Sequence, residues 1–199
     1  MEPSAFWSIA ERLAVETYRE HRFSPLEPAS PVELARRVLA DADPIFDAPW
    51  LRSGNAALFR MRDRYRIAIR PGVPVQRAMF ALCHELAHVL FDRIGFHDEP
   101  IESACDCLAA CLMSPMPAMH RLIRVCGRDP VAIAAASVGT QTWASMRVGE
   151  ALSVPVLFYD AAREKVRPRG GAEQLRLFHD RERLHAVVRR NLRVPGLRR

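Results

Sequence analysis

The sequence predicts an α+β fold in which helices dominate and one small antiparallel sheet precedes the third helix. Apolar residues recur at helical spacing along most of the chain. Between residues 56 and 70, two short runs alternate in hydrophobicity around a reversal at 62–64, as the strands of a hairpin do. The 199 residues, 49% hydrophobic and 26% charged, are enough for one packed domain with an appendage.

The first third of the chain predicts two helices and a turn. A helix is expected over residues 4–22 with Ser4 as its N-cap, followed by the proline-rich connector 24–31. The run Ser30-Pro31-Val32-Glu33 predicts a capping box and a proline in the first turn of a second helix. That helix should end near Asp41, and Ser-Gly-Asn at 53–55 should form a turn.

The hairpin and the helix after it form the centre of the predicted fold. Ile67 and Ile69 alternate with polar or small residues, which predicts a half-exposed second strand. The sequence PGVP at 71–74 closes that strand and opens a third helix, expected to run to about Phe91 before Gly95 stops it. We expect the sheet to pack against this helix.

The rest of the chain predicts further helices. One covers 101–113 and ends at Ser114-Pro115, and another surrounds 119–127. Residues 129–154 predict a helical hairpin about a turn at 137–140. The tail offers the apolar segment VPVLFY, an Arg/Gly-rich loop and a basic helix. These features predict three units, a folded domain over 1–127, a helical pair over 128–154 and a basic extension over 155–199.

Charge is unevenly distributed along the chain. Of its net charge of +6, residues 154–199 contribute 12 Lys and Arg against five Asp and Glu. This balance predicts an acidic or nucleic-acid partner for the tail, although a solvated amphipathic helix has the same composition. The sequence shows no apolar run of membrane-spanning length and no signal peptide, so we expect a cytoplasmic protein without membrane contact. The five cysteines form no C-x-x-C pair, which favours small buried side chains over metal ligands.

The stretch Cys83-His84-Glu85-Leu86-Ala87-His88 carries the strongest chemical signal. His84 and His88, at i and i+4, project from one face of a helix, so that both imidazoles can bind one metal ion. Glu85 is turned about 100° from the first ligand, where it can act on a water molecule as general base. Two core histidines with backbone partners are the alternative interpretation.

A third ligand is expected from the next helix. Glu102 begins that helix fourteen residues after His88, and Asp106 lies one turn later on the same face. Glu102 can complete the metal site, while Asp106 can accept the spare N–H of a ligand histidine. His97 and Glu99 are rivals for the third position, but both precede the helix. The expected metal is zinc, which manganese or iron could replace.

Residues 5–118 resemble the ImmA/IrrE family of bacterial zinc metallopeptidases, whose signature is a Phe-x-x-x-HExxH helix followed by a Glu-x-x-Ala-Asn helix ending in Leu-Met-Pro. The matching segments are RAMFALCHELAHVLF and ESACDCLAACLMSP, in which Cys105-Asp106 stands for Ala-Asn. The resemblance implies a zincin-like, gluzincin-type domain with His84, His88 and Glu102 as zinc ligands and Glu85 as catalytic base. It also implies a cytoplasmic protease that cuts a helix-turn-helix repressor and so relieves repression, in a stress response or a mobile element.

Two features leave alternatives open. Residues 129–154 loosely follow a helix-turn-helix pattern, with Thr140 capping the second helix and Arg147 as its one strong DNA-contact candidate, but a helical hairpin packed on the peptidase domain fits equally well. The whole chain could accordingly be a DNA- or partner-binding regulator with a structural or inactive metal site. Glu85 favours the enzyme, because a structural site needs no general base. Tyr65 and Arg66 are candidates for stabilising the oxyanion.

Overall fold

A computed structural model describes residues 3–40, 43–62, 64–97, 101–153, 156–160 and 165–169. These residues form seven helices and two two-stranded antiparallel sheets, which confirms the α+β class. The elements are α1 (Pro3–Glu20), α2 (Pro31–Val38), β1 (Ala56–Met61), β2 (Arg64–Ile69), α3 (Val75–Arg93), α4 (Ile101–Met113), α5 (Met116–Cys126), α6 (Pro130–Ser137), α7 (Gln141–Ala151), β3 (Val156–Asp160) and β4 (Lys165–Arg169).

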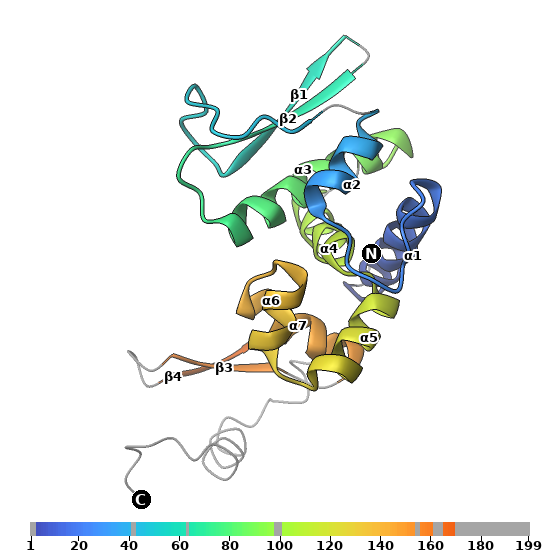
Figure 1. Ribbon diagram of the computed structural model, residues 1–199, viewed down its shortest axis with the longest axis vertical. Coiled ribbons are helices and arrows are strands. Elements are labelled where there is room, and N and C mark those ends of the chain that lie inside the picture. The colour runs from blue at the N-terminus through green and yellow to red at the C-terminus, as the bar shows by residue number, and fades with distance from the viewer. Residues whose placement is uncertain are drawn as a thin grey trace, which may run out of the picture.

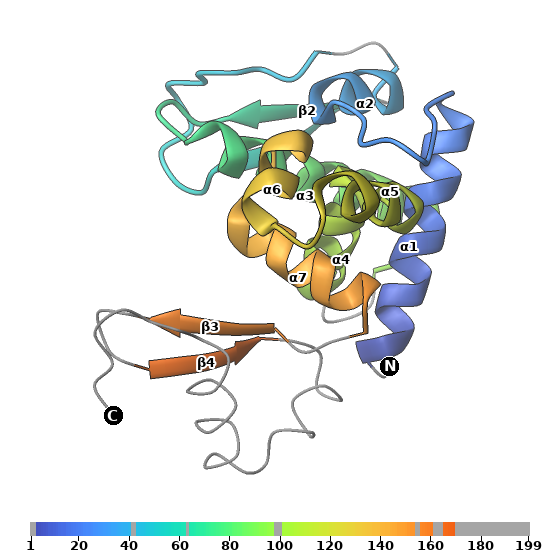
Figure 2. The same ribbon diagram turned by 60° about the horizontal axis from the view of Figure 1, so that its bottom comes forward.

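Helices α3 and α4 form the centre of the fold (Figure 1). The β1–β2 hairpin and α2 contact α3, and α1 contacts α4. Helices α5, α6 and α7 lie at the opposite end from the hairpin in Figure 1, and Figure 2 shows the three helices grouped together. Within the described residues, no helix is long and apolar enough to cross a membrane.

Small side chains bring α3 and α4 close together. Cys83 and Ala87 on α3, and Cys105 and Ala109 on α4, are fully buried, with Leu82, Leu86 and Leu108 around them. All five cysteines are free thiols, and Cys107 and Cys126 are only partly buried. Burying the larger apolar side chains contributes about 1.5–3 kcal/mol each to folding. The same contact leaves the polar edges of both helices on one side of the pair.

The hairpin has the predicted strands and reversal, with Leu58 opposite Ile67 and Arg60 opposite Tyr65. The prediction of a half-exposed β2 is wrong, because Ala68 is fully buried together with Ile67 and Ile69. A segment for which no strand was predicted also lies beside β2. Ile45 forms a parallel bridge to Ala68 on the edge of β2 away from β1, so β2 has neighbours on both edges.

The ends of the first helices differ from the sequence predictions. Helix α1 begins at Pro3, so Ser4 lies inside it and is not the N-cap. Ser30 does hold the N-cap position of α2, but its side chain makes no capping hydrogen bond, and Glu33 pairs with Arg36 and Arg37 instead. The capping box is therefore absent, and α2 ends at Val38, before the predicted Asp41.

The end of α3 follows the prediction more closely. The helix continues to Arg93, and Gly95 then takes a left-handed backbone conformation with φ +69°. Glycine adopts this conformation without the steric cost that a side chain brings. Gly95 and Phe96 donate their backbone N–H groups to the carbonyls of Asp92 and Phe91, which closes the helix.

The predicted helical pair is present as α6 and α7. The Thr140 hydroxyl accepts a hydrogen bond from the Trp143 backbone N–H and caps α7, as expected. Gly139 is required in the turn, since a Cβ built there would lie 2.3 Å from the Trp143 ring. Trp143 is buried in the same apolar cluster as α3 and α4 and donates its indole N–H to the Ala110 carbonyl. The packing of Trp143 thus joins the pair to the central helices.

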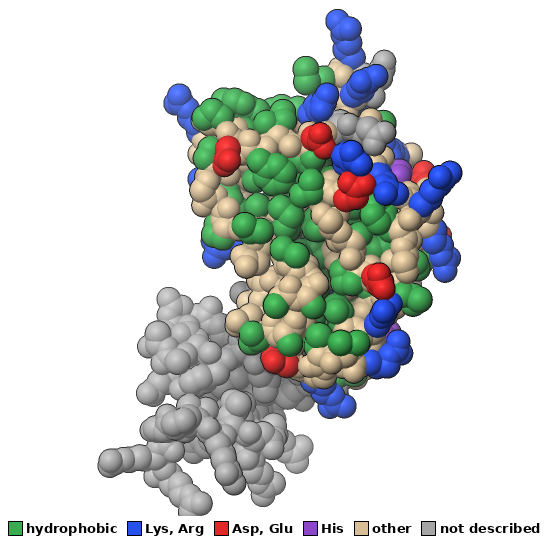
Figure 3. Space-filling model, viewed as in Figure 1, with side chains coloured by type: hydrophobic (Ala, Val, Ile, Leu, Met, Phe, Trp, Pro, Cys, Tyr) green, Lys and Arg blue, Asp and Glu red, His purple; other side chains and the backbone are tan. Residues whose placement is uncertain are grey.

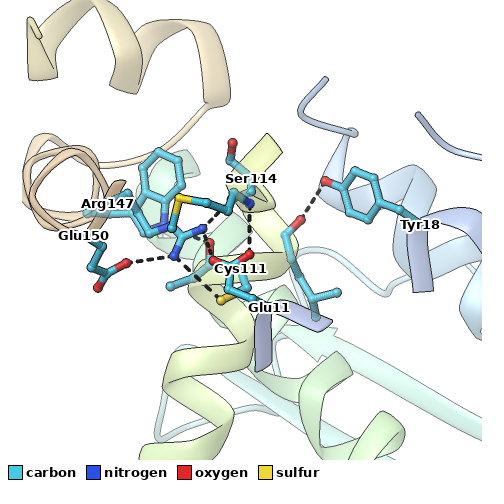
Figure 4. A network of polar contacts seen from close by, with 10 residues as sticks. Glu11, Tyr18, Cys111, Ser114, Arg147 and Glu150 are labelled. Carbon is cyan, nitrogen blue, oxygen red and sulfur yellow. Dashed lines mark hydrogen bonds and ion pairs between the residues drawn. The ribbon is translucent and has the colours of Figure 1, made fainter. Parts of the chain in front are cut away.

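Arg147 on α7 is buried in a polar network that joins α7 to α1, α4 and α5 (Figure 4). Its guanidinium donates to Glu11 on α1, to Glu150 at 2.7 Å and to the Ser114 carbonyl at 2.8 Å. Glu11 also accepts from the Met116 backbone N–H at the start of α5. With its side chain 1% exposed, Arg147 has no surface to offer a DNA backbone, contrary to its predicted candidacy.

The tail departs from its predicted form where it is described. β3 contains part of the apolar segment, and β4 occupies residues that were expected to form an Arg/Gly-rich loop. The two strands pair antiparallel, with Val156 opposite Arg169. The predicted basic helix lies outside the described residues.

We expect Arg147→Met to lower the free energy of unfolding by about 3–5 kcal/mol, because Glu11 and Glu150 would lose their shared buried cation. Chemical denaturation followed by circular dichroism measures the change. Arg121→Met is the matched control, since it breaks an exposed ion pair with Glu27 and should change the free energy little. Equal stability of Arg147→Met and the wild-type protein would show that the network contributes no stability.

Candidate metal centre and cleft

Two histidines stand side by side on the exposed edge of α3. The ring centroids of His84 and His88 are 5.0 Å apart, as the i, i+4 spacing on a helix requires. The side chains are 18% and 25% exposed, so the imidazoles are partly buried but reachable from solvent. The predicted pair therefore faces outward, and the interpretation of both residues as core histidines does not hold.

Glu102, in the first turn of α4, reaches both imidazoles. Its carboxylate oxygens lie 3.2 Å from His84 Nε2 and 3.5 Å from His88 Nε2. Two donors bound at about 2.1 Å to one tetrahedral ion would be separated by roughly 3.4 Å. The three donor atoms all lie within 4.8 Å of one another, and the described residues contain no other such group of His, Cys, Asp and Glu. This donor set fits a divalent ion of the zinc type.

Asp106 fixes the orientation of one of these rings. Its Oδ1 lies 2.8 Å from His84 Nδ1, on the far side of the ring from Glu102. An ionised carboxylate only accepts hydrogen bonds, so Nδ1 carries the proton and Nε2 keeps its lone pair for a metal. The Asp106 hydrogen bond raises the pKa of His84, whereas burial and the neighbouring His84 lower the pKa of His88.

Glu85 stands apart from the three donors but in the same cleft. Its carboxylate is within hydrogen-bonding reach of the Leu58 backbone N–H on β1. Burial raises the pKa of Glu85, which brings this carboxyl closer to the range where a general base works. The cysteine next to the site has different chemistry, because burial raises the pKa of Cys105 to about 12 and keeps the thiol protonated.

The cleft is an open cavity of about 610 Å³ between the hairpin and α3, closed at one end by the start of α4. His84, Glu85, His88 and Glu102 share it with Leu58, Arg60, Tyr65 and Asp92, among others. Arg60 and Asp92 also line the cleft, although neither was a candidate from the sequence motifs. The strand periodicity could have found Arg60, which is two residues from Leu58 and so on the same face of β1.

The other candidates from the sequence, for stabilising the oxyanion and for the third metal ligand, lie in different places. Tyr65 lines the cleft and donates its hydroxyl to Asp92, while Arg66 stands opposite Phe59 on the other face of the hairpin and is not part of the cleft wall. His97 is 67% exposed and, among the described carboxylates, pairs with that of Asp92 at 3.9 Å, so it is not in the donor group. Glu99 lies outside the described residues.

Comparison with known proteins agrees with this geometry. Residues 50–136 match the family model of the IrrE N-terminal-like domain, Peptidase_M78. This segment contains the hairpin, α3, α4 and all four residues predicted from the motif and its third ligand. No curated protein matches the chain significantly. The predicted resemblance to the ImmA/IrrE family is therefore confirmed over residues 50–136.

We expect Asp106→Asn to weaken zinc binding by about 10–100-fold, because the His84 ring loses the charged acceptor that holds its tautomer. Competition with a chromophoric chelator measures the affinity. Asp47→Asn, a change at an exposed loop residue away from the cleft, is the control and should bind zinc as the wild-type protein does. Unchanged affinity in Asp106→Asn would remove Asp106 from the metal site.

Proposed function

We propose, from the presence of an IrrE-type peptidase domain over residues 50–136, that the chain is a zinc-dependent endopeptidase. Its proposed substrate is a cytoplasmic protein, in the first place a helix-turn-helix transcriptional repressor whose cleavage relieves repression. One observation carries the proposal. A single carboxylate, Glu102, lies within 3.5 Å of both histidine nitrogens, while Glu85 remains outside the donor group and lines the same cleft.

Three residues would hold the metal and one would move the proton. His84, His88 and Glu102 offer two nitrogens and a carboxylate, the set found in zinc hydrolases with an open fourth position. A bound zinc ion supplies Lewis acidity and lowers the pKa of water at the site. The Glu85 carboxylate accepts the proton of the attacking water and returns it to the leaving amide nitrogen. The raised pKa of Glu85 favours this return.

The open edge of strand β1 favours a peptide as the substrate. Within the described residues, β1 pairs with no strand except β2, so its other edge, where the Leu58 N–H faces Glu85, is open to a further strand. An extended peptide can add to such an edge through main-chain hydrogen bonds, which do not depend on its sequence. Ala56 and Ala57 line this part of the cleft and leave room for a peptide backbone. The Leu58 contact to Glu85 would place that peptide next to the base.

The alternative, a DNA- or partner-binding regulator with an inactive metal site, has less support. Helices α6 and α7 carry one basic residue between them, and that residue is the buried Arg147. The basic residues of 170–199 lie outside the described part of the chain, so nucleic-acid contact by the tail remains a prediction. A regulator of this kind would have no use for Glu85 in the cleft.

We expect Glu85→Gln to bind zinc nearly as tightly as the wild-type protein but to cleave at least 10²–10⁴-fold more slowly, because the change removes a proton acceptor and no ligand. Zinc stoichiometry and a peptide-cleavage assay separate the two properties. Glu102→Ala is the paired variant and should lose zinc as well as activity. Cleavage by Glu85→Gln at the wild-type rate would contradict the peptidase mechanism.

We also expect a helix-turn-helix repressor encoded next to this gene to be cut at one site when incubated with the zinc-loaded protein. Mass spectrometry of the fragments identifies the bond. A chelator should stop the reaction and added zinc should restore it. If the repressor stays intact while another cytoplasmic protein is cut, the chain is still a peptidase but the repressor is not its substrate.

A further inference from the structure

One end of the cleft presents an arginine whose hydrogen-bonding groups are available. Arg60 is the only Arg or Lys among the described residues that line the cleft, and its side chain is 66% exposed. Building on the proposed peptidase function, we propose that Arg60 forms a subsite for an acidic side chain of the protein substrate. The aspartate or glutamate would lie two to three residues from the bond that is cut.

The described neighbours of Arg60 contact it without accepting a hydrogen bond from it. Its guanidinium lies 5.6 Å from the centre of the Tyr65 ring, and the Tyr65 hydroxyl is bound to Asp92. Among the described residues, Arg60 forms one long ion pair, in which Asp92 Oδ2 is 4.0 Å from Arg60 Nη1, too far for a hydrogen bond. Arg60 donates no hydrogen bond to any described residue. A planar guanidinium of this kind can bind an incoming carboxylate through two parallel hydrogen bonds.

The distance along the cleft from Glu85 to Arg60 determines which residue of the substrate Arg60 would bind. Leu58 contacts Glu85, and Arg60 is nearest to Asp92, so β1 and α3 run in the same direction along the cleft. From residue 58 to residue 60 a strand advances about 7 Å, and from residue 85 to residue 92 a helix advances about 10 Å. An extended peptide covers that distance with two to three residues, at roughly 3.3 Å each.

The outer end of the hairpin is positively charged, as Arg60 is. From Phe59 to Arg66 the sequence contains four arginines and one aspartate, and Arg62 and Arg64 are exposed. Figure 3 shows basic side chains gathered at this end of the molecule. Such a field attracts acidic partners and raises their rate of association. The recognised substrate segment should therefore carry net negative charge, with one residue engaged by Arg60.

The test uses fluorescent decapeptides that share the same apolar central residues. Each peptide carries Asp, Asn or Lys at the second or third position before or after that centre. Binding to the zinc-loaded Glu85→Gln protein is measured by anisotropy, and cleavage by the wild-type protein is measured by mass spectrometry. On one side of the centre, we expect the Asp peptide to bind about tenfold more tightly than the Asn peptide. In an Arg60→Glu background the Lys peptide should bind best, whereas Arg124→Glu, a matched change on α5 away from the cleft, should leave the order unchanged.

The outcomes separate this inference from the proposed function. Equal affinity for Asp and Asn peptides, or an unchanged order in Arg60→Glu, would overturn the acidic subsite even if the peptides are cut. Acid-selective binding without any cleavage that depends on Glu85 would support the subsite and overturn the peptidase. A labelled 20-base-pair DNA duplex is the third probe. If it binds more tightly than the Asp peptides and loses affinity in Arg60→Glu, the surface serves nucleic acid and the inference is wrong.

Discussion

The contact between α3 and α4 is the constraint on which the rest of the structure depends. Cysteine and alanine side chains let the two helices approach closely, and this approach brings Glu102 of one helix to the two histidines of the other. Larger residues at these positions would separate the helices and move the carboxylate away. The hairpin and α2 pack on α3, and α1 packs on α4. Trp143 and Arg147 join α7 to α4 through the Ala110 carbonyl and the Cys111 thiol. The core and the candidate metal centre therefore have one physical origin.

The different roles of the polar residues follow from the position of each residue on α3 or α4. His84 and His88 share an edge because they are one turn apart, and Glu85 is rotated off that edge toward β1. Asp106 is one turn after Glu102 and so reaches the opposite nitrogen of the His84 ring. The two helices thus supply the donors, an orienting carboxylate and a candidate base without any long loop.

Local signals in the sequence predicted most of this arrangement. Helical spacing located α3, α4, α6 and α7, and it placed His84 and His88 on one edge of α3. Long-range contacts were beyond such signals. The bridge from Ile45 to Ala68 buries a strand that its own alternation marks as half-exposed. The burial of Arg147 depends on Glu11, which lies 136 residues earlier in the chain. No local pattern distinguishes a buried, paired arginine from a solvated one.

The Arg147 network also bears on where an independently folding unit begins and ends. The segment recognisable as a peptidase domain, 50–136, contains the whole candidate metal centre but neither Glu11 nor Arg147. A fragment cut to those limits would expose the faces of α4 that α1 and α7 cover, and its surface would be apolar where the intact chain is closed. The recognisable segment is thus shorter than the segment that can remain soluble and folded. Fragments designed for expression should keep helices α1 and α7.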